Sequence, residues 1–186
     1  VKSHFVVQDD PRGQSHAIYL AKEYLTGPML IIFGDTLIET DLSFLPKETA
    51  DAVAWVKAVP DPRRFGVAET GSDGIVHRLV EKPKDLDNNL VLVGCYYFRN
   101  AADLILAIEA QMEQQIQLKG EFYLADAVNI LHARGANMRA QQVDIWLDTG
   151  TADALLETNT YLLEHGHHNY EETLEHPGIG IVPPVF

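Results

Sequence analysis

The chain alternates short apolar runs with segments whose apolar residues recur every three or four positions. The runs are typical of strands, and the longer spacing predicts helices with one apolar face. We expect strands at residues 3–7, 29–34, 51–59, 65–69, 75–80, 90–98, 137–143 and 145–147. We expect helices at residues 14–25, 101–115 and 122–134, and a last one from Thr149 or Thr151 to about Glu164. This alternation favours an α/β fold with a mixed sheet.

Two aspartates that are far apart in the sequence each end an apolar run. Asp35 follows residues 29–34, and Asp148 follows residues 143–147. Such runs suit strands buried on both faces of a mostly parallel sheet, where ligands bind at the carboxyl ends of strands. We therefore expect both carboxylates to reach a ligand or to share one Mg²⁺. For Asp148, capping the helix that starts near Ala152 is an open alternative.

A charged tip, Glu81-Lys82-Pro83, follows the expected strand at residues 75–80. A lysine offers a compact positive charge to a phosphate, and a glutamate accepts hydrogen bonds from sugar hydroxyls. A solvated hairpin end would explain the same residues.

Two glycines stand where the backbone could approach a ligand. Gly13 lies in a turn after Gln8, whose side chain could pair with a base edge. An ordinary loop is the alternative there. Gly66 opens a strand where a side chain would obstruct a ligand, and a β-bulge explains it nearly as well.

Composition narrows the class of protein. The 186 residues are 46% hydrophobic, which fits one globular domain with a sizeable core. The net charge of −13 argues against a nucleic-acid partner. No segment approaches the ~20 apolar residues that span a bilayer, so no membrane partner is expected. The lone Cys95 is compatible with the reducing cytoplasm.

The motifs, taken in order, resemble those of the sugar-1-phosphate nucleotidyltransferases, most closely the glucose-1-phosphate thymidylyltransferase group. Each motif is common alone, but the ordered set is specific and covers nearly the whole chain. The motifs are Gln8 with Gly13, Gly34-Asp35, Arg64-Phe65-Gly66-Val67, Glu81-Lys82-Pro83, Gly94-Cys95-Tyr96, Gly120-Glu121 with Asp126, and Trp146-Leu147-Asp148-Thr149-Gly150. The expected fold is therefore a Rossmann-like three-layer α/β sandwich with a mixed, mostly parallel sheet.

The resemblance implies a role for each matching residue. Asp35 and Asp148 match the aspartates that hold a catalytic Mg²⁺, and Lys82 matches a lysine that grips the sugar phosphate. The remaining matches are substrate contacts: Gln8 and Gly13 for the base, and Gly66, Glu81, Gly94, Tyr96 and Glu121 for the sugar. The implied reaction joins a nucleoside triphosphate, dTTP or UTP favoured, to a sugar-1-phosphate and releases pyrophosphate.

Several features depart from the family pattern or leave alternatives open. A glycine-rich Gly-x-Gly-Thr-Arg segment is not found, so we expect the domain at residues 1–165 to lack its first strand and phosphate loop, and the chain alone to be inactive. Residues 166–186 are expected to form a linker and the first rung of a left-handed β-helix. A guanylyl- or uridylyltransferase, or a non-catalytic regulatory module, remains an alternative function. A homo-oligomer also remains open.

Overall fold

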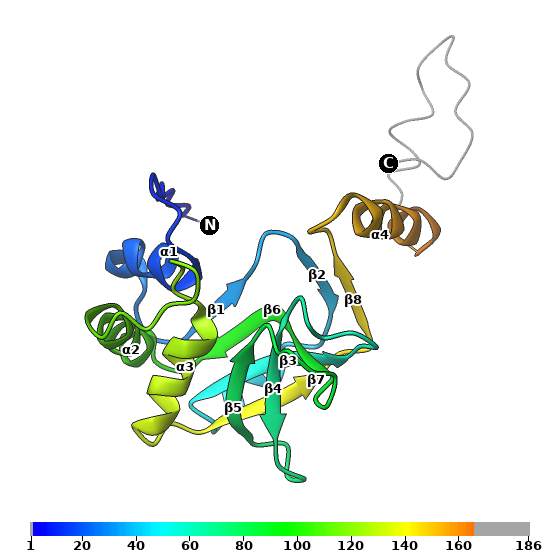
Figure 1. Cartoon of the computed structure of the whole chain (residues 1–186). Helices are drawn as coiled ribbons and strands as arrows, with labels where there is room; N and C mark the ends of the chain where they lie inside the picture. Colours follow the sequence, from blue (N-terminus) through cyan, green and yellow to red (C-terminus); the bar gives the residue numbers. More distant parts are fainter. Residues whose placement is uncertain (1, 166–186) are drawn as a thin grey trace.

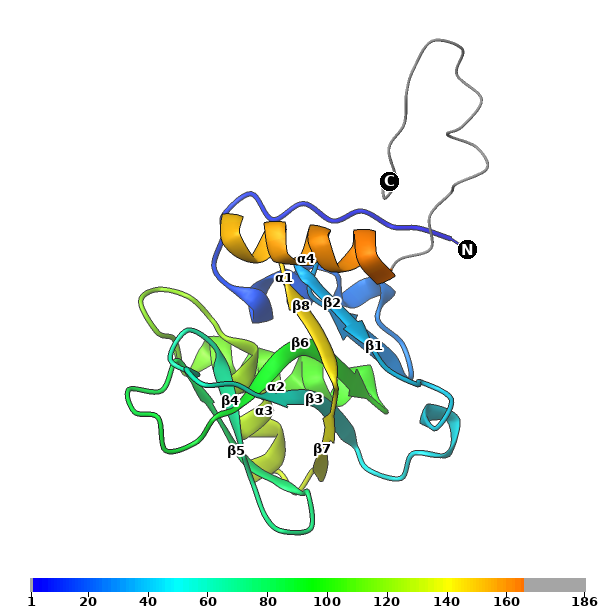
Figure 2. The same ribbon diagram turned by 90° about the vertical axis from the view of Figure 1, so that its right-hand side faces the viewer.

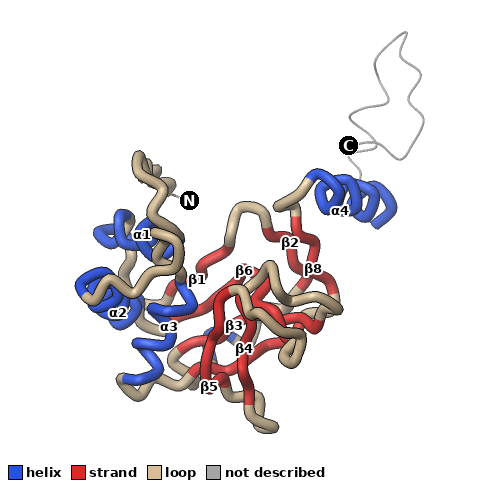
Figure 3. Tube along the Cα trace, viewed as in Figure 1, coloured by secondary structure: helices blue, strands red, loops and turns tan. Residues whose placement is uncertain are grey.

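The structure, a computed structural model, describes residues 2–165. Within them lie eight strands and four α-helices, with β1 to β6 following α1 before α2 and α3 come in succession (Figures 1 and 3). Their bounds, with two short 3-10 turns, are α1 Gln14–Leu20, η1 Lys22–Tyr24, β1 Met29–Ile32, β2 Thr36–Glu39, η2 Leu45–Lys47, β3 Ala52–Ala58, β4 Gly66–Thr70, β5 Val76–Glu81, β6 Leu90–Phe98, α2 Ala101–Glu113, α3 Leu124–Ala133, β7 Met138–Gln142, β8 Ile145–Asp148 and α4 Ala152–His165. Among these helices, none is long and apolar enough to span a membrane.

The main sheet has six strands in the order β5-β4-β6-β3-β7, with β1 also paired to β6. The α/β class and the mixed sheet are confirmed. The expectation of mostly parallel pairing is wrong for the described strands, since β3 and β7 form their only parallel pair. The β4–β5 connection shows the reason, because strands joined by a short turn must run antiparallel.

Strand β6 is shared between two neighbours along one of its edges. Its other edge pairs with β3 from Leu90 to Phe98. On the shared edge, β4 pairs at Val91, and β1 pairs from Cys95 to Phe98. Gly94 lies between these two pairings, with φ +78°. The sheet therefore forks at Gly94, and β1 and β4 diverge from that point.

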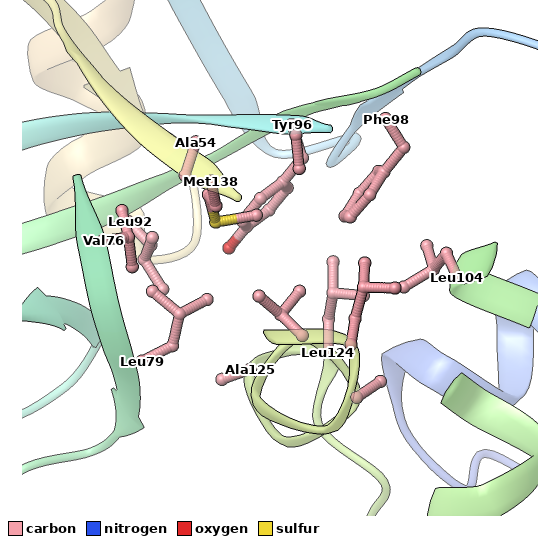
Figure 4. Close-up of a cluster of buried hydrophobic side chains, with 14 of the residues drawn as sticks. Ala54, Val76, Leu79, Leu92, Tyr96, Phe98, Leu104, Leu124, Ala125 and Met138 are labelled. Carbon is pink, nitrogen blue, oxygen red and sulfur yellow. The ribbon is translucent and has the colours of Figure 1, made fainter. Parts of the chain in front are cut away.

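Helices cover one face of the main sheet. Leu104 and Ile108 of α2 and Leu124 of α3 are fully buried against it, and they join a cluster that includes Phe98 and Met138 (Figure 4). These side chains recur at helical spacing, so their burial stabilises both helices against the sheet.

The opposite face of the main sheet carries a second, smaller cluster of buried residues. Trp55 is fully buried in this cluster, against which Phe44, Leu45 and Trp146 pack. A second, two-stranded sheet of β2 and β8 lies on this side, with α4 beside it (Figure 2). An oxygen of Thr40 accepts the indole N–H of Trp55 at 2.9 Å.

Two local expectations are also corrected. Residues 3–7 form no strand, and Phe5 is 93% exposed, because no described strand lies beside them to satisfy the backbone. Strand β1 is not buried on both faces, since Ile32 is 54% exposed. The β-helix rung expected within residues 166–186 lies outside the described residues.

Candidate functional site

A cleft of about 330 Å³ opens where the sheet forks at Gly94. Its walls come from the turn between β1 and β2, from β4, β5, β6 and β8, and from the segment before α3. Eight of the residues expected from the sequence line it: Asp35, Gly66, Glu81, Lys82, Gly94, Tyr96, Glu121 and Asp148. Tertiary folding therefore brings together most of the expected site.

A larger cavity of about 530 Å³ lies elsewhere, between the end of β6 and the helices α2 and α3. It contains none of the expected site residues, and its charged side chains include Asp51 and Arg99, which form an ion pair with one another. The smaller cleft is the stronger candidate because it gathers an ammonium group and several carboxylates from distant parts of the chain.

The two aspartates come together through the second sheet. Asp35 lies in the turn before β2, Asp148 ends β8, and the antiparallel register places Thr36 opposite Asp148. This corrects the expectation that both follow parallel strands. A Cβ atom added at Gly150 would lie 3.0 Å from Oδ1 of Asp148 and 3.7 Å from Oδ2 of Asp35, so the two carboxylates converge there.

This donor set fits Mg²⁺. Within residues 2–165, no group of three or more His, Cys, Asp or Glu side chains could hold a metal. Mg²⁺ is commonly held by one or two carboxylates, with water and substrate phosphates completing its coordination. The capping alternative for Asp148 is not borne out, because Oγ1 of Thr151 accepts the N–H of Ala154 at the start of α4.

Glu81 and Gly66 face one another across the β4–β5 hairpin. A Cβ atom at Gly66 would lie 3.0 Å from Oε2 of Glu81 and 2.9 Å from a methyl group of Leu92. The pairing register of β4 and β5 is regular at Gly66 and shifts only near Thr70. The lack of room for a side chain, rather than a β-bulge, therefore explains this glycine. A side chain at this position would push against the carboxyl group.

Burial raises the pKa of Glu81 to about 7. The Lys82 ammonium opposes this shift in pKa, while the carboxylates of Asp126 and Glu121 add to it. Near neutral pH this carboxyl group therefore exists in both forms. It can accept a hydrogen bond when ionised and donate one when protonated.

Lys82 is exposed, but its ammonium group has a fixed partner, which argues against a simple hairpin end. Its Nζ donates to the hydroxyl of Tyr123 at 2.8 Å and lies 4.7 Å from the centre of that ring. The hydrogen bond to Tyr123 is the largest cause of a raised Lys82 pKa, so the amine stays protonated. Its φ of +48° is unusual for a residue with a side chain and marks local strain.

Gly94 lets the β1–β2 turn approach β6. A Cβ atom there would lie 2.8 Å from both a ring carbon of Phe33 and Oγ1 of Thr36. That hydroxyl donates to the carbonyl oxygen of Val93 at 2.8 Å. Tyr96, two residues along, is buried in the core but also lines the cleft, and burial raises its pKa.

Gln8 and Gly13, the expected base contacts, lie beside the cleft and are not among its lining residues. Gly13 has φ +94°, and a Cβ atom there would lie 2.7 Å from the backbone N and O of Phe122. The two residues flanking Phe122, Glu121 and Tyr123, line the cleft. The turn is thus pressed against the segment that forms one cleft wall.

Other lining residues were not expected from the sequence. They are Gln14, Arg64, Phe65, Tyr123 and Trp146, among others. The rings of Phe65 and Trp146 meet edge to face, with centroids 5.2 Å apart. Three of the named residues, Arg64, Phe65 and Trp146, lie inside motifs already noted, but Tyr123 lies among apolar residues and carries no signal that would set it apart from the core.

Comparisons with known proteins extend over the same residues. A family model described as nucleotidyl transferase matches residues 1–165. The bifunctional protein GlmU of Methanococcus aeolicus is 30% identical over 165 residues, covering 88% of this chain and 39% of the relative. A glucose-1-phosphate thymidylyltransferase of Streptomyces griseus is 31% identical over 171 residues, covering 88% and 46%. The chain spans less than half the length of these two relatives.

Solved structures share the fold. A UDP-glucose pyrophosphorylase complexed with UDP-glucose superimposes with a TM-score of 0.69 at 21% identity, covering 84% of this chain and 64% of that one. A nucleoside-diphosphate-sugar pyrophosphorylase from Vibrio cholerae gives a TM-score of 0.67 at 20% identity, covering 81% and 66%. Since the family model matches from residue 1 to the end of α4, the chain belongs to the nucleotidyl transferase family.

Proposed function

We propose that the protein transfers a nucleotidyl group from a nucleoside triphosphate, dTTP or UTP favoured, to a sugar-1-phosphate and releases pyrophosphate. The observation that carries this proposal is the convergence of Asp35 and Asp148 in one cleft with Lys82 and Glu81. Two carboxylates suit a metal-bound triphosphate, and the other two groups suit a phosphorylated sugar. The thymidylyltransferase of Streptomyces griseus, a relative over most of this chain, supports the same substrate class.

The reaction is an in-line displacement at phosphorus. A phosphate oxygen of the sugar-1-phosphate forms a bond to the α-phosphorus, and the bond from the α-phosphorus to the oxygen bridging the β-phosphate breaks. Pyrophosphate leaves with that electron pair. The attacking phosphate is already ionised, so no general base is required, and catalysis consists mainly of positioning and charge stabilisation.

Lys82 would hold the attacking phosphate. Its ammonium group lines the cleft and is kept charged and oriented by Tyr123. Asp35 and Asp148 would hold Mg²⁺, which supplies positive charge against the nucleotide phosphates when bound. The three side chains that we assign to phosphate binding, directly or through Mg²⁺, thus line the same cleft.

The sugar would lie against Gly66, Glu81, Gly94, Tyr96 and Glu121, which line the same cleft. Because Gly66 has no side chain, a hydroxyl group of the sugar could reach the carboxyl group of Glu81. The base would lie toward Gln8 and Gly13, beside the wall formed by residues 121–123.

Calorimetric titration with UDP-glucose and dTDP-glucose, in Mg²⁺ and in EDTA, tests this proposal. We expect Mg²⁺-dependent binding to the 186-residue chain, and pyrophosphate release from dTTP or UTP by the complete gene product. A panel of dTTP, UTP and GTP separates the thymidylyltransferase from the uridylyl- and guanylyltransferase alternatives. The proposal is wrong if no nucleotide-sugar binds and no triphosphate yields pyrophosphate with any sugar-1-phosphate tested.

A further inference from the structure

We infer that His16 is a positioning residue that orients the side-chain amide of Gln8, so that the site accepts bases with a protonated ring nitrogen. Uracil, thymine and guanine have such an N–H, whereas cytosine and adenine have an unprotonated nitrogen at the corresponding position. This inference rests on the proposed function, because it assigns the triphosphate class to the same site.

The amide of Gln8 touches two groups of the turn that leads into α1. Its Nε2 lies 3.2 Å from the carbonyl oxygen of Gly13 and 2.8 Å from Nδ1 of His16. The Gly13 oxygen can only accept, and it also accepts the N–H of Ala17 at 3.2 Å. The amide atom that faces it must therefore be the nitrogen, because an oxygen there would meet another acceptor.

The assignment of Gln8 also determines which tautomer a neutral His16 adopts. An amide nitrogen carries two hydrogens, and the carbonyl of Gly13 and Nδ1 of His16 take one each. Nδ1 must then act as an acceptor, which places the ring proton of a neutral imidazole on Nε2. Within residues 2–165, no group donates a hydrogen bond to Oε1 of Gln8. The atom that Gln8 has to offer a ligand is therefore an acceptor.

The turn that carries these groups is fixed against the wall of the cleft. Phe122 donates its N–H to the carbonyl oxygen of Arg12 at 2.9 Å and accepts the N–H of Ser15 at 3.0 Å. Gly13 packs against the same peptide, where a Cβ atom would have no room. Oε1 of Gln8 is therefore held in a constant place relative to the cleft wall.

A fixed acceptor discriminates between bases. The N3–H of uracil or thymine, or the N1–H of guanine, donates to it. Cytosine and adenine present a lone pair instead, so that two acceptors would face each other. A polar site built for one pattern disfavours the other because the acceptor is left without its hydrogen bond.

The test compares His16→Leu with His16→Asn in the complete gene product. Leucine removes the acceptor, whereas the Oδ1 of asparagine stands the same number of bonds from Cα as Nδ1 of histidine. We measure binding of UTP, dTTP, GTP, CTP and ATP by calorimetry for the wild type and both variants. The wild type should bind UTP or dTTP at least about 10-fold more tightly than CTP, since one neutral hydrogen bond is worth about a factor of ten. Most of this preference should be lost in His16→Leu and kept in His16→Asn.

A second measurement does not depend on nucleotide binding or on the stability of the variants. Long-range ¹H–¹⁵N NMR of the wild-type protein reports which nitrogen of His16 carries the proton, and we expect Nε2. A proton on Nδ1 of the neutral ring, or an unchanged UTP-to-CTP preference in His16→Leu, would overturn the inference while leaving the proposed function intact. If none of the triphosphates binds to the wild type, the proposed function itself fails.

Discussion

Thr149 joins the two aspartate-bearing turns by donating twice to the carbonyl oxygen of Asp35. Its backbone N–H donates at 2.9 Å and its Oγ1 at 3.1 Å, across 114 residues of sequence. Because Thr149 directly follows Asp148, these bonds set the spacing of the two carboxylates. The geometry of the proposed metal site thus depends on backbone groups as well as on the aspartates.

Thr149→Val removes the hydroxyl bond and keeps the backbone bond. We expect a loss of about 0.5–1.5 kcal/mol in unfolding free energy, measured by urea denaturation. Mg²⁺-dependent binding of UDP-glucose should weaken by less than about 10-fold, because the N–H of Thr149 still holds the turn. Thr160→Val is the matched control, since its Oγ1 donates to a carbonyl within α4. Equal weakening of Mg²⁺-dependent binding in both variants would contradict the link to the metal site.

Asp35→Asn and Asp148→Asn should each weaken Mg²⁺-dependent binding of a nucleotide-sugar on the order of 100-fold, because a neutral amide replaces a charged oxygen ligand. Calorimetry with and without EDTA measures the effect. Asp153→Asn serves as the control, since this exposed aspartate lies in the first turn of α4 and does not line the cleft. An Asp35→Asn protein that binds as the wild type does would point to a non-catalytic module.

Gly94→Ala should destabilise the protein by more than Gly27→Ala. Both glycines have positive φ, so each substitution carries a backbone penalty of about 1–2 kcal/mol. At Gly94 the new methyl group also meets Phe33 and Thr36 at 2.8 Å, whereas at Gly27 nothing lies within 4 Å. We expect the difference between the two variants to be about 1–3 kcal/mol in denaturant titrations. Equal losses of unfolding free energy in the two variants would mean that the β1–β2 turn moves away from the new methyl group at little cost.

Tyr123→Phe should raise the KM for the sugar-1-phosphate about 3- to 10-fold and change kcat less, because Lys82 would have to be ordered when the substrate binds. Steady-state kinetics of pyrophosphate release by the complete gene product give both constants. Tyr24→Phe is the control, since Tyr24 is half exposed and lies outside the cleft. An unchanged KM in Tyr123→Phe would show that Tyr123 does not position Lys82.

The raised pKa of Glu81 predicts a specific pH dependence of stability. Its folded-state pKa lies above the ordinary value of 4.5, at about 7, so the folded protein binds this proton more tightly than the unfolded chain does. Stability should therefore fall as the pH rises from about 4.5 to 7 and then level off, by an amount on the order of 1–3 kcal/mol.

Glu81→Gln should lack this component and be more stable than the wild type above pH 7, as measured by denaturation across the pH range. The exposed Glu69→Gln on the neighbouring strand should leave the profile unchanged. If Glu81→Gln kept the wild-type slope, another group would be responsible. Sugar-phosphate binding that requires an ionised Glu81 should strengthen over the same pH range.

Several elements could be predicted because short-range pattern decides them. The bounds expected for β6 are those observed, and the β4–β5 hairpin forms as its glycine-containing turn indicates. That Asp35, Lys82 and Asp148 line one site was also foreseeable, since residue type and motif order indicate it. The strand expected at residues 3–7 was wrong because an apolar run says nothing about whether a partner strand lies beside it.

The amino-acid sequence by itself therefore determined where most of the strands and helices form and which side chains could bind phosphates, a metal or a sugar. Only the tertiary structure decided that β2 and β8 pair antiparallel and bring Asp35 to Asp148, that β6 forks at Gly94 to open the cleft, and that Tyr123 holds Lys82. The physical reason is how far apart in the sequence the interacting residues lie. Strand and helix formation depend on neighbours along the chain, whereas pairing direction and side-chain contacts depend on residues that meet only after folding.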